Sequence, residues 1–373
     1  MFGTTRKKGT AALAACALIA GGAFAGCGTN DDDGDGGGGD SGGSKSGKIA
    51  LLLPESKTAR YESQDRPNFE KKAKELCPDC EIIYSNADQD AAKQQQQADA
   101  ALTKGAKVLV LDPVDAASAG GIVAKAKQKD VPVVSYDRLI TKADVDYYIS
   151  FDNEQVGKLQ AQTLVKKMGE DGSAKGPITM INGAPTDSNA ALFKKGATGV
   201  FKAEGVKIGK SYDTPDWSPD KAQQEMEQAI TGLGDDGFTA VYAANDGTAG
   251  GAIAAMKSAG IKPSERPTTG QDAELAAIQR ILAGEQYMTV YKAIKPEAQK
   301  AAEIAVDLVQ GKKPSGVSET VNNEQKDVPS VLLTPVAVTK DNINDTIVKD
   351  GFWKPSQICT KQYAADCKEA GIE

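Results

Sequence analysis

The chain has 373 residues, a formal net charge of −7 and no histidine. The lack of histidine excludes Ser-His-Asp catalysis and any metal site that needs an imidazole ligand. An acidic chain without a basic stripe is also a poor binder of nucleic acid, so we expect no nucleic-acid partner.

The first 26 residues have the order of a secretory signal peptide. Three basic residues come first, an apolar run follows over 11–24, and small residues lead to Cys27. The run is too short and too rich in small residues for a comfortable membrane span. The end of this segment resembles a bacterial lipoprotein signal, which implies that Cys27 carries a lipid anchor. The alternative is an ordinary cleavage site with an incidental cysteine.

Residues 27–47 form a segment dominated by Gly, Asp and Ser, with no apolar residue able to nucleate a core. This composition is typical of a flexible, solvated linker. Its aspartates lack the glycine and closing glutamate of a calcium loop, so we expect no calcium site here. We interpret the segment as a tether that holds a globular body off a membrane.

From Lys48 onward, short apolar runs alternate with longer amphipathic stretches. In the first half, the sequence predicts strands at 48–54, 81–85, 107–113 and 131–137, and helices over 68–76, 88–104 and 116–129. This regular alternation predicts a parallel sheet with helices on both faces.

The pattern restarts after the apolar run 147–153. Predicted strands follow at 178–183, 206–212, 238–246, 268–272 and 286–292, with helices over 190–202, 221–231, 249–259 and 275–283. A helix over 295–310 and a strand over 331–338 complete the set. A body of this length is large for one core, so the fold class that we predict is α/β, with two doubly wound parallel-sheet lobes.

We expect the chain to cross between the lobes three times, near 150–153, 291–293 and 328–335. The N-terminal lobe would then hold residues 48–151 and 293–328, and the C-terminal lobe residues 152–292 and 329–373. Three crossings would form a hinge that lets the lobes close on a ligand.

Four cysteines remain after Cys16 and Cys27 are set aside. In an exported protein an even number pairs as disulfides, most simply Cys77 with Cys80 and Cys359 with Cys367. A redox role for the CPDC motif is the alternative. We disfavour it because the motif closes a predicted helix, whereas a thiolate is stabilised at a helix start.

Polar side chains follow almost every predicted strand, where ligands bind in open parallel sheets. They are Asp137, Arg138, Asn182, Asp187, Asn189, Asn245, Asp246, Gln271, Asp272 and Lys292. These groups donate and accept hydrogen bonds in about equal number, which suits a ligand with several hydroxyls. Two aromatic residues lie in loops nearby, Tyr61 and Trp217, and an aromatic face can stack on the C–H face of a sugar ring.

Each feature also has a structural interpretation. Asp137 and Arg138 could form an ion pair with each other, and Asn245 could cap the next helix. Lys292 could be a solvated charge between the lobes, and Trp217 could be buried in a core. Because such groups recur at five successive strand ends, a shared binding site is the stronger hypothesis.

Several stretches resemble the D-xylose-binding proteins of bacterial sugar ABC importers, which belong to the pentose and hexose class of type I periplasmic binding proteins. The resemblance covers nearly all of residues 48–354. It is carried by SYDRLI, YYISFDNEQVGKLQAQ, NAALFKKG, ANDGTAGGAIAAM, GQDAELAAIQRILAGEQYMTVYKAI and KDVPSVLLTPVAVTKDNINDTIVKDGFW.

The resemblance implies a sugar pocket formed by Arg60, Tyr61, Arg138, Asn189, Trp217, Asn245, Asp272 and Lys292, to which the strand end adds Asp137. The family usually has Trp where Tyr61 stands, so the loop SKTARY bears on which sugar is bound. Neither a metal nor a cofactor is expected.

The resemblance implies an extracytoplasmic, monomeric receptor that delivers a monosaccharide, D-xylose first of all, to an ABC permease. The alternatives are another aldose (glucose, ribose, arabinose or galactose), or a sugar sensor for a membrane receptor. A glycosidase using Asp137 and Asp272 is disfavoured, because Arg138 and Lys292 would keep both carboxyls ionised. Without histidine, we expect binding to be nearly constant between about pH 6 and pH 8.

Overall fold

The computed structural model describes residues 46–372. The predicted signal segment 1–26, Cys27 and the linker as far as residue 45 lie outside the described residues. Within residues 46–372, none of the helices has the length and apolar character needed to cross a membrane.

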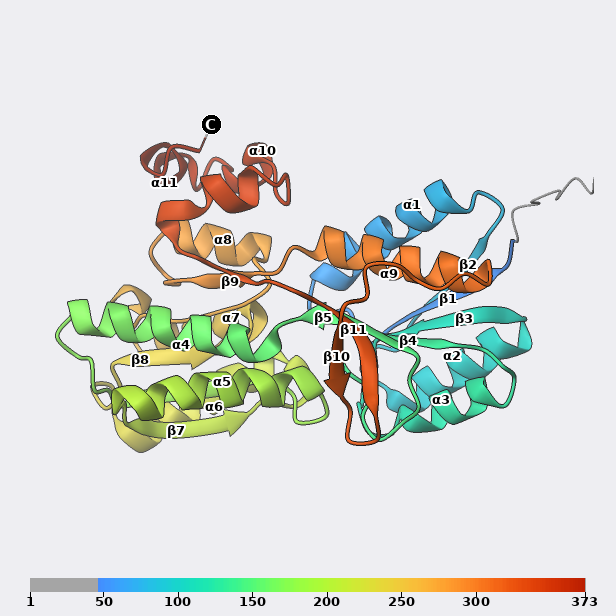
Figure 1. The fold of residues 1–373 in the computed structure, drawn as a ribbon. Coiled ribbons are helices and arrows are strands. Elements are labelled where there is room, and N and C mark those ends of the chain that lie inside the picture. Colours follow the sequence, from blue (N-terminus) through green and yellow to red (C-terminus); the bar gives the residue numbers. More distant parts are fainter. Residues whose placement is uncertain (1–45, 373) are drawn as a thin grey trace, which may run out of the picture. The chain divides into compact units, whose positions relative to one another are not determined.

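The first lobe is built on a single sheet (Figure 1). In spatial order its strands are β10 (Glu319–Asn322), β11 (Asp327–Leu333), β5 (Tyr147–Phe151), β4 (Val133–Tyr136), β3 (Ala106–Leu111), β1 (Lys48–Leu53) and β2 (Glu81–Asn86). All neighbours pair in parallel except β10 and β11. The predicted parallel sheet is therefore confirmed, with an additional antiparallel edge strand, β10.

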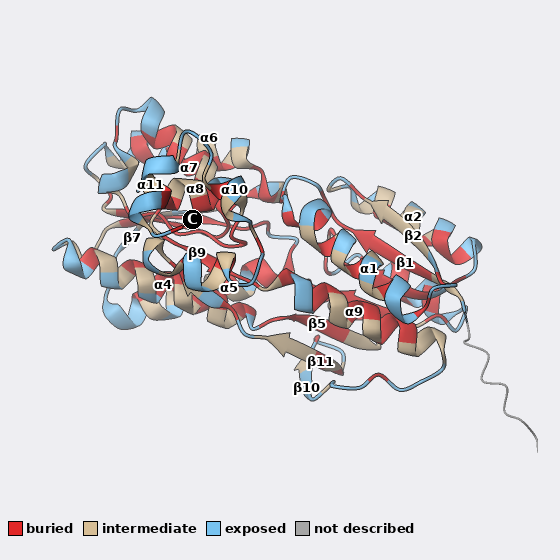
Figure 2. Cartoon of the chain, turned by 90° about the horizontal axis from the view of Figure 1, so that it is seen from above, coloured by how far each residue is buried: buried red, intermediate tan, exposed pale blue. Residues whose placement is uncertain are grey.

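Helices cover both faces of this sheet, because strands such as β1 are apolar on both sides. On one face lie α2 (Ala91–Thr103) and α3 (Gly120–Lys127), and on the other α1 (Arg66–Leu76) and α9 (Ile294–Val309). Figure 2 shows the buried strands between helices whose outer faces are exposed. This sandwich fixes the carboxyl ends of the strands at one edge of the lobe.

The second lobe repeats the arrangement with a smaller parallel sheet, in the order β7 (Ile208–Asp213), β6 (Ile178–Asn182) and β8 (Ala240–Ala243). One face is covered by α4 (Asn153–Glu170) and α5 (Ser188–Glu204), and the other by α6 (Pro219–Leu233) and α7 (Asp246–Ser258). A separate antiparallel pair, β9 (Thr289–Tyr291) and β12 (Val336–Val338), lies beside α8 (Leu275–Leu282).

Two predictions about elements were wrong, and one helix was not predicted. Residues 268–272 form no strand and make only one bridge, from Thr268 to Val241, because the backbone turns left-handed at Asp272 and Ala273. The predicted strand 331–338 is interrupted by Pro335, which separates β11 from β12. Helix α4, which our sequence analysis did not identify, follows β5 directly and is capped by Asp152, whose side chain accepts from the amide of Gln155.

The chain passes between the lobes after β5, after β9 and between β11 and β12. The last predicted boundary, after residue 328, falls inside β11. This strand pairs with β5 as far as Leu333, so it belongs to the first sheet throughout its length. The boundary is displaced because the ladder with β5 continues until Pro335 ends it.

Both expected disulfides are present. Cys77 is joined to Cys80 at the end of α1, and Cys359 to Cys367 in a C-terminal tail that contains α10 (Pro355–Ile358) and α11 (Ala364–Glu369). The tail packs against α8 and β9 through buried residues including Ile358 and Cys367. The C-terminal tail thus belongs to the second lobe.

Candidate functional site

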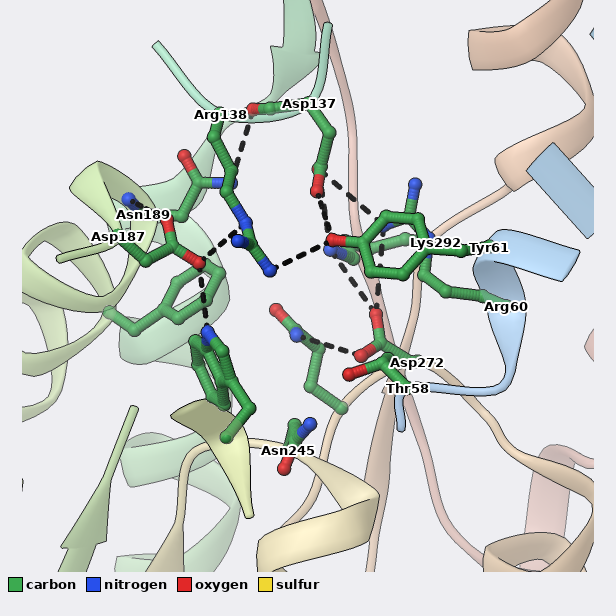
Figure 3. Close-up of a pocket in the computed structure, with 13 residues that line it drawn as sticks. Thr58, Arg60, Tyr61, Asp137, Arg138, Asp187, Asn189, Asn245, Asp272 and Lys292 are labelled. Carbon is green, nitrogen blue, oxygen red and sulfur yellow. Dashed lines mark hydrogen bonds and ion pairs between the residues drawn. The ribbon is translucent and has the colours of Figure 1, made fainter. Parts of the chain in front are cut away.

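A cavity of about 20 Å³ lies where the carboxyl ends of strands from both lobes meet (Figure 3). Its lining is Thr58, Arg60, Tyr61, Asp137, Arg138, Asp187, Asn189, Phe193, Trp217, Asn245, Gln271, Asp272 and Lys292. All nine predicted site residues line this one pocket. Within residues 46–372, no group of three or more Cys, Asp and Glu side chains is arranged to hold a metal ion.

Three of the lining residues have left-handed backbone conformations, although none is glycine. They are Asp137 (φ 55°), directly after β4, Trp217 (φ 53°) and Asp272 (φ 92°). Such a conformation is uncommon for residues other than glycine and costs about 1–3 kcal/mol. Figure 3 shows the side chains of Asp137 and Asp272 directed into the pocket, and Trp217 lines it as well.

Arg60 is held mainly by carboxyl groups of its own lobe. Its Nε and Nη2 atoms donate to Asp65 at 3.0 and 2.6 Å, and Nη2 also donates to Glu297 at 2.8 Å. Burial alone would lower the pKa of Arg60, but Asp137, Asp65 and Glu297 together raise it well above its usual value. Only Nη1 is directed to the pocket carboxylates, 3.4 Å from Asp137 and 3.8 Å from Asp272.

Asp137 is surrounded by donors. Tyr61 donates its hydroxyl to Asp137 at 3.2 Å, Arg60 lies 3.4 Å away and Lys292 Nζ lies 3.8 Å away. Burial by itself would raise the pKa of Asp137, but Arg60, Lys292 and Arg138 outweigh it and lower the pKa to about 2. Asp137 is therefore a permanent carboxylate, able to accept hydrogen bonds from a ligand.

Arg138 forms no ion pair with its neighbour Asp137. Its Nε atom lies 2.9 Å from Asp187 of the second lobe, and its guanidinium donates to the Tyr61 hydroxyl at 3.1 Å and to the carbonyl of Pro113 at 3.3 Å. The structural alternative for the adjacent pair is thus wrong, because the left-handed turn at Asp137 sends the two side chains in different directions.

Lys292 lies at a chain crossing and joins carboxylates of both lobes, with Nζ 3.2 Å from Asp272 and 3.8 Å from Asp137. It is fully buried, so the alternative of a solvated charge is wrong. Asn189 joins the lobes as well, because its Nδ2 donates to the carbonyl of Asp137 at 3.1 Å. The polar groups of the pocket therefore link the two lobes directly.

Two side chains offer polar atoms that the described residues leave free. Asn245 Oδ1 accepts from the amide of Thr248 and caps α7, so the capping interpretation is confirmed. No hydrogen bond uses its Nδ2 among residues 46–372, and that group remains available in the pocket. Gln271 donates to Asp272 at 3.2 Å, while its buried Oε1 has no partner. A buried polar atom of this kind costs free energy until a partner pairs with it.

Aromatic rings border the polar groups. Tyr61 comes from the first lobe, and Trp217 and Phe193 come from the second, where their rings meet edge to face at 6.4 Å. Trp217 donates its ring N–H to Asp187 at 3.0 Å and is buried as the alternative interpretation expected, yet it lines the pocket too. Gly183 makes room for it, since a Cβ atom there would lie 2.0 Å from the indole.

Two lining residues were not predicted individually, although both lie in a stretch that carries the family resemblance or in the SKTARY loop. Phe193 lies on α5 at a position that reads as an ordinary core residue, and Thr58 lies in the irregular loop after β1. Asp187 and Gln271 were recognised only as members of the strand-end set. No sequence signal distinguishes Phe193 from Phe201, which is buried in the core of the same helix.

Two α/β lobes joined by three crossings, with a polar and aromatic pocket between them, define a type I periplasmic binding protein fold. The chain belongs to the periplasmic binding protein domain family, whose model matches residues 49–313. Among its relatives is the D-xylose-binding periplasmic protein of Escherichia coli, 41% identical over 84% of this chain and 93% of that protein.

The multiple sugar-binding periplasmic receptor ChvE of Rhizobium radiobacter is 33% identical, over 84% of this chain and 92% of the receptor. Among solved structures, an ABC transporter solute-binding protein from Clostridium phytofermentans with bound β-D-glucose superposes with a TM-score of 0.75. It is 29% identical and covers 83% of this chain and 99% of its own.

Proposed function

We propose that this chain is an extracytoplasmic receptor for a neutral monosaccharide, D-xylose first of all, which it delivers to an ABC permease by closure of its two lobes. The observation that carries the proposal is the pocket at the lobe junction. Polar groups of both lobes line it together with aromatic rings. A ligand that contacts both lobes has a higher affinity for the closed form, which is what drives closure.

The charges of the lining favour a neutral ligand. Arg60, Arg138 and Lys292 are matched by the carboxyl groups of Asp137, Asp187 and Asp272. A sugar suits a lining of matched charges, since its hydroxyls donate and accept while its C–H faces contact Tyr61, Phe193 or Trp217.

D-Xylose stands first because the relatives at 41% identity are named as D-xylose-binding proteins. Another aldose is the alternative, since ChvE is named as a receptor for multiple sugars and the Clostridium protein holds β-D-glucose. Tyr61, where the family usually has Trp, is the residue on which we expect the choice to depend.

We further propose that the protein is a monomer, is anchored through Cys27 and is not an enzyme. Asp137 is a poor general acid, because its neighbours lower its pKa to about 2. Release of product from an aryl glycoside, abolished by Asp137→Asn or Asp272→Asn, would contradict this view. A sensor of bound sugar is the second role to consider; uptake that survives deletion of the gene would favour it.

The test of the proposal is calorimetric titration of the purified chain with xylose, glucose, ribose, arabinose and galactose in turn. We expect D-xylose to bind with a dissociation constant near micromolar or below, about 8 kcal/mol. Tight binding of a different sugar would support the receptor function and would indicate that the loop of Tyr61 determines which sugar is bound. Binding of none of the five would contradict the proposal.

A further inference from the structure

The pocket carboxylate Asp272 lies in the most unusual backbone segment of the site. Asp272 and Ala273 have φ values of 92° and 49°, so two consecutive residues with side chains are left-handed. Each such residue is disfavoured sterically and persists only where its surroundings hold it. The direction of the Asp272 side chain therefore depends on whatever fixes this turn.

Three backbone groups of the turn are fixed from inside the second lobe. The amide of Asp272 donates to the carbonyl of Val290 at 2.9 Å, and the amide of Ala273 donates to Thr289 Oγ1 at 3.2 Å. The amide of Glu274 donates to Asp246 Oδ2 at 2.9 Å. These three bonds leave the carbonyl of Ala273 to be satisfied from outside.

The carbonyl of Ala273 accepts a hydrogen bond from the C-terminal tail. The indole N–H of Trp353 donates to the carbonyl of Ala273 at 2.7 Å. Trp353 is in turn fixed by Phe352, whose ring meets it edge to face at 5.4 Å and meets Tyr291 at 5.1 Å. Tyr291 directly precedes Lys292, so Phe352 connects Trp353 to the crossing that carries the cationic partner of Asp272.

The disulfide tail keeps Trp353 in place. Gln279 of α8 donates to the carbonyls of Gln357 and Ile358, at 3.3 and 3.2 Å, and Ile358 is completely buried. The next residue is Cys359, joined to Cys367, which is buried in the same cluster. Helix α8 begins two residues after Ala273, so the tail contacts both the turn and the helix that follows it.

We propose that Trp353 is a positioning residue of the binding pocket: it fixes the Asp272–Ala273 turn from behind, and the disulfide-closed tail exists to hold it there. Trp353 does not line the pocket and touches no ligand. Its effect reaches a ligand through Asp272, which lies 3.2 Å from Lys292. The effect on affinity rests on the proposed function, whereas the effect on the turn does not.

The test uses Trp353→Phe, which keeps an aromatic ring and removes the N–H donor. Hydrogen exchange of the purified chain, without sugar, should be about 3- to 10-fold faster at the amides of residues 272–274 and unchanged in β1 and β3, the range expected for one hydrogen bond. The double variant Cys359→Ser/Cys367→Ser should produce the same local change, with little added by combining it with Trp353→Phe. Tyr363→Phe, in the same tail but with no side-chain hydrogen bond among residues 46–372, is the matched control.

Calorimetry with the best sugar of the panel supplies the second readout. Trp353→Phe should weaken binding about 3- to 10-fold, and this loss should disappear when Asp272 is already changed to Asn. A parent chain that binds no sugar would contradict the proposed function and leave the exchange experiment to decide on Trp353. Unchanged exchange at 272–274, or an equal loss of affinity in the Asp272→Asn background, would overturn the inference.

Discussion

Arg138 of the first lobe and Asp187 of the second form a buried ion pair, with Nε 2.9 Å from Oδ2. Two further contacts join the lobes nearby: the amide of Leu139 donates to Ser188 Oγ, and the amide of Ala116 donates to the carbonyl of Thr186, each at 3.0 Å. Arg138 thus has two tasks, because it lines the pocket and also compensates carboxyl groups that are buried with it.

Arg138→Ala should lower both affinity and stability. It removes a charged donor from the pocket, which should cost about 2 kcal/mol of binding, roughly 30-fold. It also leaves Asp187 and Asp112 buried without their cation, a loss of about 3–5 kcal/mol in unfolding free energy. Calorimetry and urea unfolding measure the two effects.

Arg66→Ala is the matched control for that experiment. Arg66 pairs with Glu62 and Glu70 one helical turn away and is more than a third exposed. Such surface pairs contribute at most about 1 kcal/mol. A stability loss for Arg138→Ala no larger than that of Arg66→Ala would mean that the pair between the lobes is energetically unimportant.

Gly183→Ala should displace Trp217, together with the hydrogen bond from its ring N–H to Asp187, without replacing any polar side chain of the pocket. The added Cβ would lie 2.0 Å from the indole, so the ring must move. We expect the sugar to bind at least about tenfold more weakly, a change of about 1.4 kcal/mol, with an altered tryptophan fluorescence. Gly199→Ala, in α5 with nothing within 4 Å of the new atom, should keep its affinity and gain about 0.5–1 kcal/mol in stability. Equal affinities for the two variants would contradict a role for Trp217 in binding.

The stability of the protein should fall as the pH rises toward 8. Burial, with Asp246 and Asp272 nearby, raises the pKa of Glu274 to about 8, although Arg280 and a hydrogen bond from the backbone of Ala59 oppose the shift. A carboxyl group with a raised pKa contributes its full stability below its unfolded pKa, near 4.3, and loses it as the pH rises through about 8. Burial raises the pKa of Asp246 as well, to about 7, so its contribution has the same sign.

Glu274→Gln isolates this effect. The variant should unfold at nearly the same urea concentration as the parent at pH 5 and should be the more stable of the two at pH 8, where the parent must ionise a buried carboxyl. Glu319→Gln, at an exposed position of β10, serves as the control. Parallel pH profiles for the parent and Glu274→Gln would contradict the assignment. Asp246 and Glu274 also interact with Asp272 of the pocket. A sugar affinity that changes between about pH 7 and pH 8 would contradict the constant affinity expected from the lack of histidine.

Acidic sugars should be excluded from the pocket. Because three cations already face three carboxyl groups, an added carboxylate would be buried without a free cation, which costs several kcal/mol. We expect D-xylonate to bind at least 100-fold more weakly than D-xylose, and glucuronate at least 100-fold more weakly than glucose. Comparable calorimetric affinities for an acid and its neutral parent would show that Arg138 or Lys292 is free to pair with a ligand.

The sequence predicts the strand ends well, because strands such as β1, β3 and β4 are uninterrupted apolar runs and the residue that follows each run is unambiguous. Parallel pairing places such residues at the carboxyl edges of the two sheets, and eight of the ten strand-end residues line the pocket. Asn182 and Asp246 do not, because Asn182 donates to Ser211 and Asp213 while Asp246 accepts from Gln286 and Thr289. The sheets and all nine predicted lining residues follow from this local information together with the family resemblance.

The contacts that the lining residues make with one another do not follow from the local sequence pattern. Arg60 was predicted as a pocket residue, but its main contacts are Asp65 and Glu297, and Glu297 is 237 positions away on α9. Nothing in the local pattern selects that pairing over a pairing with Asp137. The role of Trp353 was hidden for the same reason, since only the folded tail brings it to Ala273.

The three crossings also affect the order in which the protein can fold during its synthesis. The first sheet needs β11 beside β5, and its residues Ser330 and Tyr148 are neighbours although the whole sheet of the second lobe is translated between them. Helix α9, which covers one face of the first sheet, is translated equally late. The lobe that is begun first therefore stays incomplete until the sheet of the second lobe has been made, and the emerging chain keeps an unpaired strand edge and an uncovered apolar face until α9 and β11 have been translated.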